Sequence, residues 1–297
     1  MPLAPARVKR FSCRIMAVMP QPAAAGLANR RPVGIFDSGV GGLSVAREIR
    51  RALPAEDLLY VADTAYCPYG DRPEDEVRER ALAVGRHLEA AGAKVVIVAC
   101  NTATGAALES LREVLNVPVI GLEPAVKTGA ARTRNRRVGV MATVGTLRSE
   151  RFARLVRAHG EGAFVLAQPC PGLVDLIEQG HLDGDVLAAR VGELTQPLRD
   201  AQVDTVVLGC THFPFVSEAL RRALGPGVEI VDSGPAIARR LEQVLRDGDL
   251  GAPPGPGSLC VWTTGEPGAV QPVVDRLWGG AVELDRVAIS SPTRRDG

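Results

Sequence analysis

Val95-Val96-Ile97-Val98-Ala99-Cys100-Asn101-Thr102 is a short apolar run that ends in a small residue, a cysteine and a polar pair. The second half of the chain repeats this arrangement as Thr205-Val206-Val207-Leu208-Gly209-Cys210-Thr211-His212. A continuous run of β-branched residues is typical of a strand buried in a parallel sheet. The polar pair after each cysteine can open a helix, so each stretch predicts a strand followed by a helix.

The positions of Cys100 and Cys210 indicate a shared site. Open α/β sheets bind ligands beyond the carboxyl ends of their strands, so a thiol just past such a strand lies at the mouth of the sheet. Each half of the chain supplies one of the two thiols. Two thiols on either side of one substrate can act as a pair of proton-transfer groups.

Predicted strands and helices alternate along the chain from Val33 onward. Apolar residues recur at helical spacing from Pro73 to Ala91, and a second helix is predicted from Asp185 to Asp200. This alternation favours parallel sheets with helices on both faces, the α/β class. The predicted strands are Val33–Phe36, Asp57–Val61, Lys94–Ala99, Val117–Ile120, Arg137–Met141, Ala163–Leu166, Asp204–Leu208, Val228–Val231 and Leu259–Thr263.

Two internal echoes indicate two similar domains. The cysteine stretches form one echo, and Ile35-Phe36-Asp37-Ser38-Gly39 returns as Ile230-Val231-Asp232-Ser233-Gly234. We interpret both as traces of a duplication. We expect two pseudo-symmetric, doubly wound parallel-sheet domains that face each other across an active-site cleft. The first domain is expected to comprise residues 32–123 and 235–290, and the second residues 124–234.

Residues 1–31 differ in composition from the rest of the chain. Basic residues precede an apolar stretch that is interrupted at Pro20. A secretory signal is one interpretation, but the apolar stretch is too short for a good signal core. We therefore expect a disordered N-terminal extension, with Met16 or Met19 as a candidate for the true start.

Composition excludes several classes of protein. Apolar residues make up 46% of the 297, and the net charge is only +1, so no electrostatic argument favours nucleic acid as a partner. No apolar run approaches the length of a membrane span. The six cysteines contain no C-x-x-C pair and do not look like a disulfide framework. Several of them end predicted strands, which fits reduced thiols and a cytoplasmic location.

Four motifs resemble those of the glutamate racemases, within the aspartate/glutamate racemase family, and they occur in that family's order. Gly34–Val45 (GIFDSGVGGLSV) resembles the opening signature, and Cys67–Gly70 resembles the substrate-binding loop. Cys100–Thr104 and Gly209–Pro214 resemble the two catalytic motifs. The resemblance runs from about Val33 to Trp278. It implies a homodimeric enzyme that interconverts L- and D-glutamate without cofactor or metal and supplies D-glutamate for peptidoglycan.

The resemblance also implies roles for single residues. Cys100 resembles the thiol that takes the proton from D-glutamate, and Cys210 the thiol that takes it from L-glutamate. Asp37 resembles the group that assists Cys100, while His212 resembles the partner of Cys210 and Glu178 the carboxylate that orients this histidine. The residues that resemble substrate contacts are Asp37, Ser38, Tyr69, Gly70, Asn101, Thr102, Thr143, Thr211 and His212.

The chemistry of a racemase explains why two thiols are useful. Racemisation removes a proton from one face of the α-carbon and returns one to the other face, so a thiolate and a thiol on opposite sides suffice. The pKa of a free cysteine is about 8.5, and a helix N-terminus lowers it. We therefore expect both cysteines to precede a helix whose N–H groups also hold the substrate carboxylate.

Other interpretations stay open at this stage. An aspartate racemase or another cysteine-dependent isomerase of the same family is the main alternative. A single-cysteine decarboxylase of the same fold and a non-catalytic binding protein are further ones. Asp37 is alternatively the N-cap of a helix predicted from Gly41 to Leu53. His87, His159 and His181 show no ligand spacing, so no metal site is expected.

Overall fold

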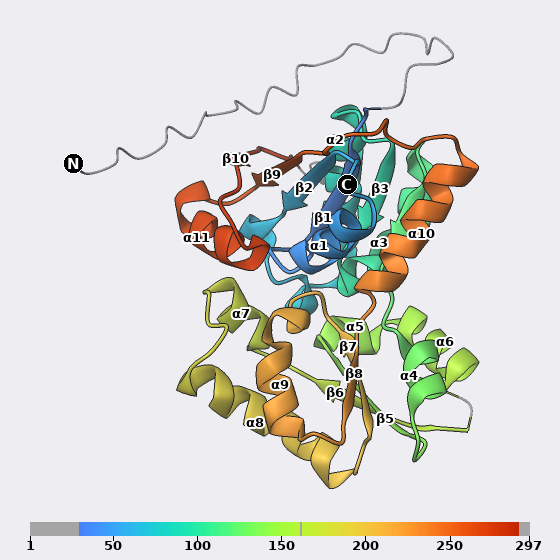
Figure 1. The fold of residues 1–297 in the computed structure, drawn as a ribbon, viewed down its shortest axis with the longest axis vertical. Helices are drawn as coiled ribbons and strands as arrows, with labels where there is room; N and C mark the ends of the chain where they lie inside the picture. The colour runs from blue at the N-terminus through green and yellow to red at the C-terminus, as the bar shows by residue number, and fades with distance from the viewer. Residues whose placement is uncertain (1–29, 161, 291–297) are drawn as a thin grey trace, which may run out of the picture.

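The computed structural model describes residues 30–160 and 162–290, which form two α/β domains stacked along the long axis of the molecule (Figure 1). One sheet has six strands in the order β10-β9-β2-β1-β3-β4, and the other has four in the order β6-β5-β7-β8. Every strand pair is parallel. The predicted α/β class with two parallel-sheet domains is confirmed, whereas the expectation for residues 1–29 lies outside the described residues.

The first sheet is buried on both faces. Its central strands are fully buried and, apart from Asp37 at the end of β1, have no charged residue, as the continuous apolar runs predict for a parallel sheet covered by helices. Helices α1, α10 and α11 pack on one face, and α2 and α3 pack on the other. The strands are β1 (Val33–Asp37), β2 (Leu58–Ala62), β3 (Val95–Val98), β4 (Val119–Gly121), β9 (Leu259–Thr263) and β10 (Leu284–Arg286).

The helices of the first domain follow the expected periodicity. In α2 the residues Val77, Ala81, Val84 and Leu88 are buried together in one core cluster. The helix begins after Pro73 and ends before Gly92, whose φ of +88° suits glycine. The helical segments are α1 (Leu43–Ala52), η1 (Thr64–Tyr66), η2 (Tyr69–Asp71), α2 (Glu74–Ala90), α3 (Asn101–Val114), α10 (Gly234–Asp247) and α11 (Pro267–Trp278).

The second sheet is smaller and also lies between helices. One core cluster joins its strands to α7, α8 and α9, and another joins them to α4 and α6. Strand β6 forms the sheet edge and is only partly covered. The strands are β5 (Arg137–Ala142), β6 (Phe164–Pro169), β7 (Thr205–Gly209) and β8 (Glu229–Val231). The helical segments are α4 (Val126–Arg132), α5 (Val144–Arg148), α6 (Glu150–His159), α7 (Leu173–Glu178), α8 (Asp185–Asp200), η3 (Phe213–Val216) and α9 (Ser217–Leu224).

The two sheets share one strand order. β2-β1-β3-β4 corresponds to β6-β5-β7-β8, so the strands that precede Cys100 and Cys210 occupy equivalent places. The second sequence echo is different. Asp37 ends the central strand β1, whereas Asp232 follows the edge strand β8, which corresponds to β4. The resemblance between these two Asp-Ser-Gly turns therefore does not reflect equivalent positions.

The two segments that cross between the domains run side by side. The hydroxyl of Ser233 donates a hydrogen bond to the carbonyl of Glu123 at 2.6 Å. After the first crossing, Val126 of α4 packs in a core cluster of the second domain, and after the second crossing, Ile237 of α10 packs in the first. We keep 123/124 and 234/235 as the proposed domain limits.

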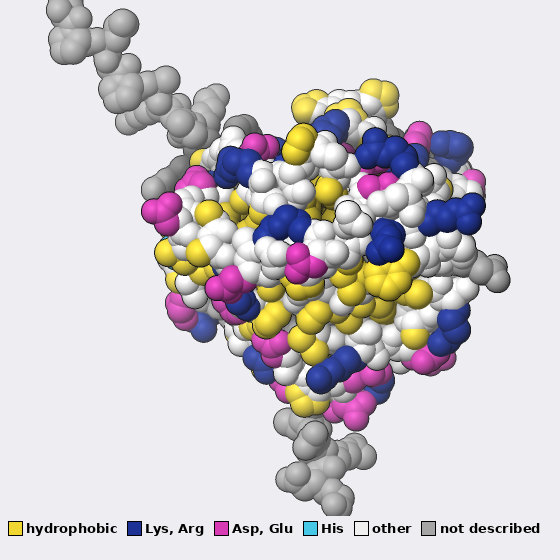
Figure 2. Space-filling model, turned by 90° about the horizontal axis from the view of Figure 1, so that it is seen from below, with side chains coloured by type: hydrophobic (Ala, Val, Ile, Leu, Met, Phe, Trp, Pro, Cys, Tyr) yellow, Lys and Arg dark blue, Asp and Glu magenta, His cyan; other side chains and the backbone are white. Residues whose placement is uncertain are grey.

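The surface of the second domain mixes charges of both signs. Viewed from below, Lys/Arg and Asp/Glu side chains are interspersed around a patch of hydrophobic side chains (Figure 2). Phe164 and Val186 of this domain are exposed large apolar residues. Among the described helices, none combines the length and the apolar character that a membrane crossing requires.

Candidate active site

A pocket lies where the carboxyl ends of the strands of both domains meet, as expected for open α/β sheets. Residues from loops after β1, β3, β5 and β7 line it, so both domains contribute. Every candidate residue from the sequence except Glu178 is part of the lining. The lining residues are Asp37, Ser38, Pro68, Tyr69, Gly70, Cys100, Asn101, Thr102, Thr143, Thr146, Val174, Gly209, Cys210, Thr211 and His212.

Cys100 is the N-cap residue of α3. Its Sγ accepts a hydrogen bond from the backbone N–H of Ala103 at 3.5 Å, and the residue is buried. Burial and the neighbouring Asp37 carboxylate raise the pKa of Cys100 well above its usual value, and the helix N–H only partly offsets this. The helix N-terminus is where the sequence predicts it, but the expectation of a lowered pKa is wrong for Cys100, because burial outweighs the helix.

Asp37 joins the two halves of the pocket. Its Oδ1 accepts the backbone N–H of Ser38 at 2.6 Å, and its Oδ2 accepts the hydroxyl of Thr211 at 2.9 Å. Burial raises the pKa of Asp37, while His212 and the hydrogen bonds lower it. The alternative role as an N-cap is wrong: α1 begins after Gly42, and no side chain caps it.

Cys210, His212 and Glu178 form a chain of contacts. Cys210 Sγ lies 3.7 Å from His212 Nδ1, and His212 Nε2 lies 2.6 Å from Glu178 Oε1. Burial lowers the pKa of His212, but Cys210 and Glu178 raise it, and the net pKa is well above 6.5. Unlike Cys100, Cys210 does not cap an α-helix: the short 3₁₀ segment η3 follows it, with His212 as the N-cap.

Two glycines make room for this chain of contacts. A Cβ on Gly39 would lie 1.9 Å from Glu178 Oε1, and a Cβ on Gly41 would lie 2.2 Å from His212 Nδ1. The backbone N–H of Val40, between them, donates to Glu178 Oε1 at 2.7 Å. The glycine-rich turn after β1 therefore lets the first domain approach the second without a side chain in the way.

A buried ion pair holds the loop that carries Tyr69. The Tyr69 hydroxyl donates to Asp63 Oδ2 at 2.5 Å, and Arg80 donates to both oxygens of the same carboxylate, at 2.7 and 3.0 Å. Arg80 also lies over the ring of Tyr66, 3.9 Å from its centroid. Neither Asp63 nor Arg80 belongs to a motif named in the sequence analysis.

Hydroxyl and amide groups fill the remaining wall of the pocket. Thr102 Oγ1 lies 2.9 Å from Thr143 Oγ1 and 3.2 Å from Thr146 Oγ1. Asn101 Oδ1 is buried and, among the described residues, has no hydrogen-bond partner. The sequence analysis missed Thr146, although its spacing of three residues from the N-cap Thr143 places both at the start of α5.

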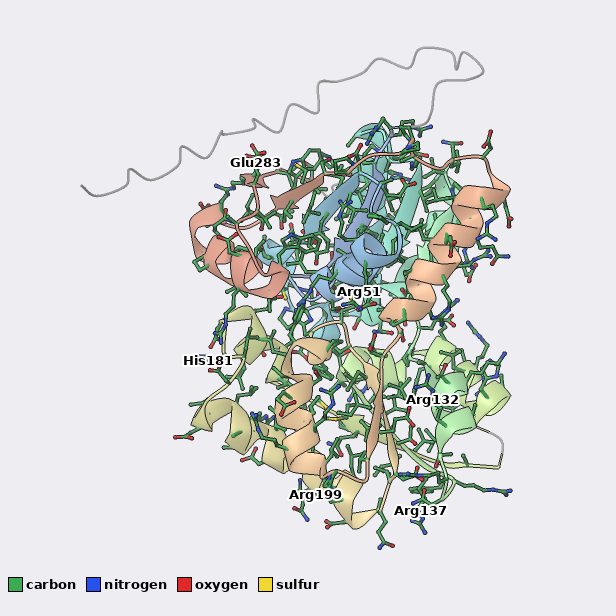
Figure 3. All side chains as sticks on the ribbon, in the orientation of Figure 1. Arg51, Arg132, Arg137, His181, Arg199 and Glu283 are labelled. Atoms are coloured by element: carbon green, nitrogen blue, oxygen red, sulfur yellow. The ribbon has the colours of Figure 1, made fainter. Side chains whose placement is uncertain are left out.

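The other cysteines and histidines lie elsewhere. Cys67 and Cys170 are free thiols outside the pocket lining, whereas Cys260 is disulfide-bonded, so the expectation of reduced cysteines is wrong for Cys260. His87 packs edge-on against Trp262. His181, labelled in Figure 3, lies at the outer edge of the second domain, in a segment whose Gly180 and Asp183 accept hydrogen bonds from Arg276 of the first domain at 2.8 Å.

Comparison with known proteins agrees with this geometry. A sequence model of the Asp/Glu/Hydantoin racemase family matches residues 33–241. The chain belongs to this family. The match begins at β1 and includes both cysteine motifs, so the racemase family model covers the segments that build the pocket.

Individual members of the racemase family match over nearly their whole length. A protein named glutamate racemase from Pseudomonas paraeruginosa is 46% identical, with 88% of this chain and 99% of the relative covered. The crystal structure of a glutamate racemase isoform from Bacillus anthracis matches with a TM-score of 0.82 at 32% identity, covering 88% of this chain and 98% of that one. The crystal structure of Escherichia coli glutamate racemase, solved with L-glutamate and the activator UDP-MurNAc-ala, matches with a TM-score of 0.78 at 34% identity. The match covers 88% of this chain and 99% of that one. The chain is therefore an amino-acid racemase by family and by fold.

Proposed function

We propose that the chain interconverts L-glutamate and D-glutamate by a cofactor-independent reaction between two cysteines, and that it supplies D-glutamate for peptidoglycan. The observation that carries the proposal is the meeting of Cys100 and Cys210 in one pocket, each delivered by the equivalent strand of its own domain. The substrate comes from the relatives named glutamate racemase. The cell-wall role is what the resemblance of the sequence motifs to that family implies.

Cys100 and Cys210 have different charged groups beside them. Cys210 and Glu178 raise the pKa of His212 well above its usual value, and the ring lies 3.7 Å from Cys210 Sγ, where a cationic imidazole can stabilise a thiolate. Cys100 is held as a neutral thiol by burial and by Asp37. A thiolate at Cys210 and a thiol at Cys100 form a base and an acid, which is what the conversion of L-glutamate into D-glutamate needs.

The proton balance of the forward reaction follows from this pair. The Cys210 thiolate takes the α-proton of L-glutamate and becomes a thiol, and the electron pair of the broken C–H bond stays on the substrate. The Cys100 thiol gives its proton to the opposite face and becomes a thiolate. The reverse reaction starts from the opposite protonation states, with D-glutamate as the substrate.

The polar wall of the pocket suits an amino acid. Asn101 Oδ1 is a buried acceptor available to the α-ammonium group. The N–H groups at the start of α3 and the hydroxyls of Thr102 and Thr143 suit a carboxylate. We assign Ser38, Tyr69, Gly70, Thr211 and His212 as further contacts, and we propose a cytoplasmic homodimer.

Chiral chromatography of the purified chain with L- and D-glutamate and with L- and D-aspartate tests the proposal. Turnover of both glutamate enantiomers and negligible turnover of aspartate are expected, because a site built to pair a distal carboxylate rejects a chain one methylene shorter. Comparable turnover of aspartate would assign the chain to an aspartate racemase. No turnover of any of the four would favour a binding protein.

A further inference from the structure

Three side chains beside the pocket have the chemistry of metal ligands. Cys67, Glu178 and His212 each offer one ligand atom, and these atoms lie within 4.8 Å of one another. Cys67 follows η1 in the first domain, whereas Glu178 ends α7 and His212 follows β7 in the second. The three therefore meet across the junction between the domains.

The donor set matches a soft divalent cation. Zinc binds cysteine sulfur, histidine nitrogen and carboxylate oxygen, and sites with three protein ligands leave a fourth position open. Ligand atoms about 2.0–2.3 Å from the metal lie roughly 3.3–3.8 Å from one another in a tetrahedron.

We propose that Cys67, Glu178 and His212 bind Zn²⁺ and that the bound ion switches the enzyme off. The ion would not take part in the reaction. It would occupy the place of the proton that His212 Nε2 and Glu178 Oε1 now share across 2.6 Å, and Cys67 would give up its own proton to solvent and bind as the thiolate.

The expected inhibition of the enzyme follows from the two ring nitrogens of His212, because a metal ion on one of them fixes the proton on the other. With one nitrogen of His212 on the ion, a neutral ring carries its proton on the other nitrogen. Nδ1 lies 3.7 Å from Cys210 Sγ, so that proton points at the sulfur. The ring can then no longer take a proton from the Cys210 thiol.

The ion would also fasten the two domains together. Glu178 already accepts the N–H of Val40 from the first domain at 2.7 Å, and Cys67 would add a second link from that domain. An ion that binds only the folded, closed arrangement raises the unfolding temperature of the protein. The bound enzyme is thus expected to be both more stable and less active.

Metal binding can be measured without turnover. Isothermal titration of the metal-free full-length chain with Zn²⁺ is expected to give one equivalent on this site. Co²⁺ serves as the spectroscopic probe, since sulfur coordination gives a near-ultraviolet charge-transfer band. Cys67→Ala and Cys67→Ser are each expected to weaken Zn²⁺ binding at least tenfold and to remove the band.

Cys170→Ala is the matched control. Cys170 is a buried free thiol, whereas Cys67 is partly buried, and Cys170 Sγ donates to the carbonyl of Gln168. This variant should bind both ions like the wild type. In glutamate turnover, each protein is compared with and without Zn²⁺: the ion should inhibit the wild type and Cys170→Ala, and it should leave the turnover of the two Cys67 variants at their own metal-free level.

Only the predicted inhibition rests on the proposed glutamate reaction. The metal site and the reaction can therefore fail independently. No binding heat and no band in the wild type, or binding unchanged in both Cys67 variants, overturns the site. Binding that needs Cys67 but leaves glutamate turnover unaffected overturns the switch. A chain that binds Zn²⁺ through Cys67 and turns over no glutamate keeps the metal site and refutes the proposed function.

Discussion

The hydroxyl of Thr211 donates a hydrogen bond to Asp37 Oδ2 at 2.9 Å, and this bond directly connects the carboxylate beside Cys100 with the residue that follows Cys210. Asp37 ends β1 of the first domain and neighbours Cys100, while Thr211 follows Cys210 in the second domain. Both residues are buried, so water does not compete for the bond. The environments of the two thiols are therefore coupled through one hydroxyl and one carboxylate.

Thr211→Val is expected to lower kcat/KM for glutamate in both directions. The substitution keeps the shape but leaves Asp37 Oδ2 without its donor, at a cost of about 1–3 kcal/mol in the free energy of unfolding. Steady-state kinetics and urea unfolding check both effects. Thr195→Val changes an equally buried threonine in α8 and should affect stability only. Unchanged kinetics in Thr211→Val would show that the bond plays no part in turnover.

Gly41→Ala is expected to abolish most activity without unfolding the protein. The new Cβ would lie 2.2 Å from His212 Nδ1, so the imidazole must move away from Cys210. Circular dichroism and chiral turnover measure the two effects separately. Gly268→Ala is the control, because a Cβ there meets nothing within 4 Å. Wild-type activity in Gly41→Ala would mean that the position of His212 is not important.

Much of this arrangement could be predicted from sequence, because its signals are local. The run Val95–Val98 is entirely β-branched, and a polar pair follows Cys100, so both the strand and the helix after it were predictable. The predicted strand from Leu259 to Thr263 matches β9. Strand β10 was missed because it has only three residues, too few to show an alternation of apolar and polar residues in the sequence. It pairs with β9 at the edge of the sheet.

The rest depends on tertiary contacts that no local pattern reveals. The proximity of Cys67 to Glu178 and His212 arises only when the domains meet. The raised pKa of Cys100 likewise comes from burial and from Asp37, which overrule the helix N-terminus that the sequence indicates. The sequence similarity between the turns at Asp37 and Asp232 led to a wrong expectation of equivalent positions for the same reason. The two turns follow strands that occupy different places in their sheets.

Arg80→Met is expected to destabilise the fold by about 3–5 kcal/mol, because it leaves the buried Asp63 carboxylate without its cation. The double variant Asp63→Asn/Arg80→Met removes the uncompensated charge and should recover part of this loss. Guanidinium unfolding of the two single variants, the double variant and the wild type gives the coupling energy. A double variant no more stable than Arg80→Met would contradict the buried-charge explanation.

Glu178→Gln is expected to flatten the pH dependence of stability. A raised folded-state pKa for His212 gives stability that is fully present below its unfolded value of about 6.5 and is lost as the pH rises through the folded value. Without the carboxylate the folded-state pKa rises less, so the loss above pH 6.5 is smaller. Because Cys100 also titrates at alkaline pH, the difference in unfolding free energy between the two proteins is the quantity to follow. Parallel curves would rule out the charged pair.

Cys100→Ala and Cys210→Ala should each abolish racemisation, because neither thiol can reach the face that the other serves. The remaining thiol can still remove the α-proton of the enantiomer on its own side and return a solvent proton to the same face. In deuterium oxide, Cys210→Ala should therefore label D-glutamate without inverting it, and Cys100→Ala should label only L-glutamate. Chiral chromatography with mass spectrometry separates exchange from inversion.

The matched control for this experiment is Cys170→Ala, which removes a buried thiol outside the pocket lining and should racemise both enantiomers. Serine is a poorer replacement at Cys100 and Cys210, since its hydroxyl can pass on a residual proton. Missing exchange has little weight by itself, because the bound thiol trades its proton with water at a limited rate. Full racemisation by either alanine variant is decisive: it would mean that one base serves both faces of the α-carbon, and the paired-cysteine mechanism would be wrong.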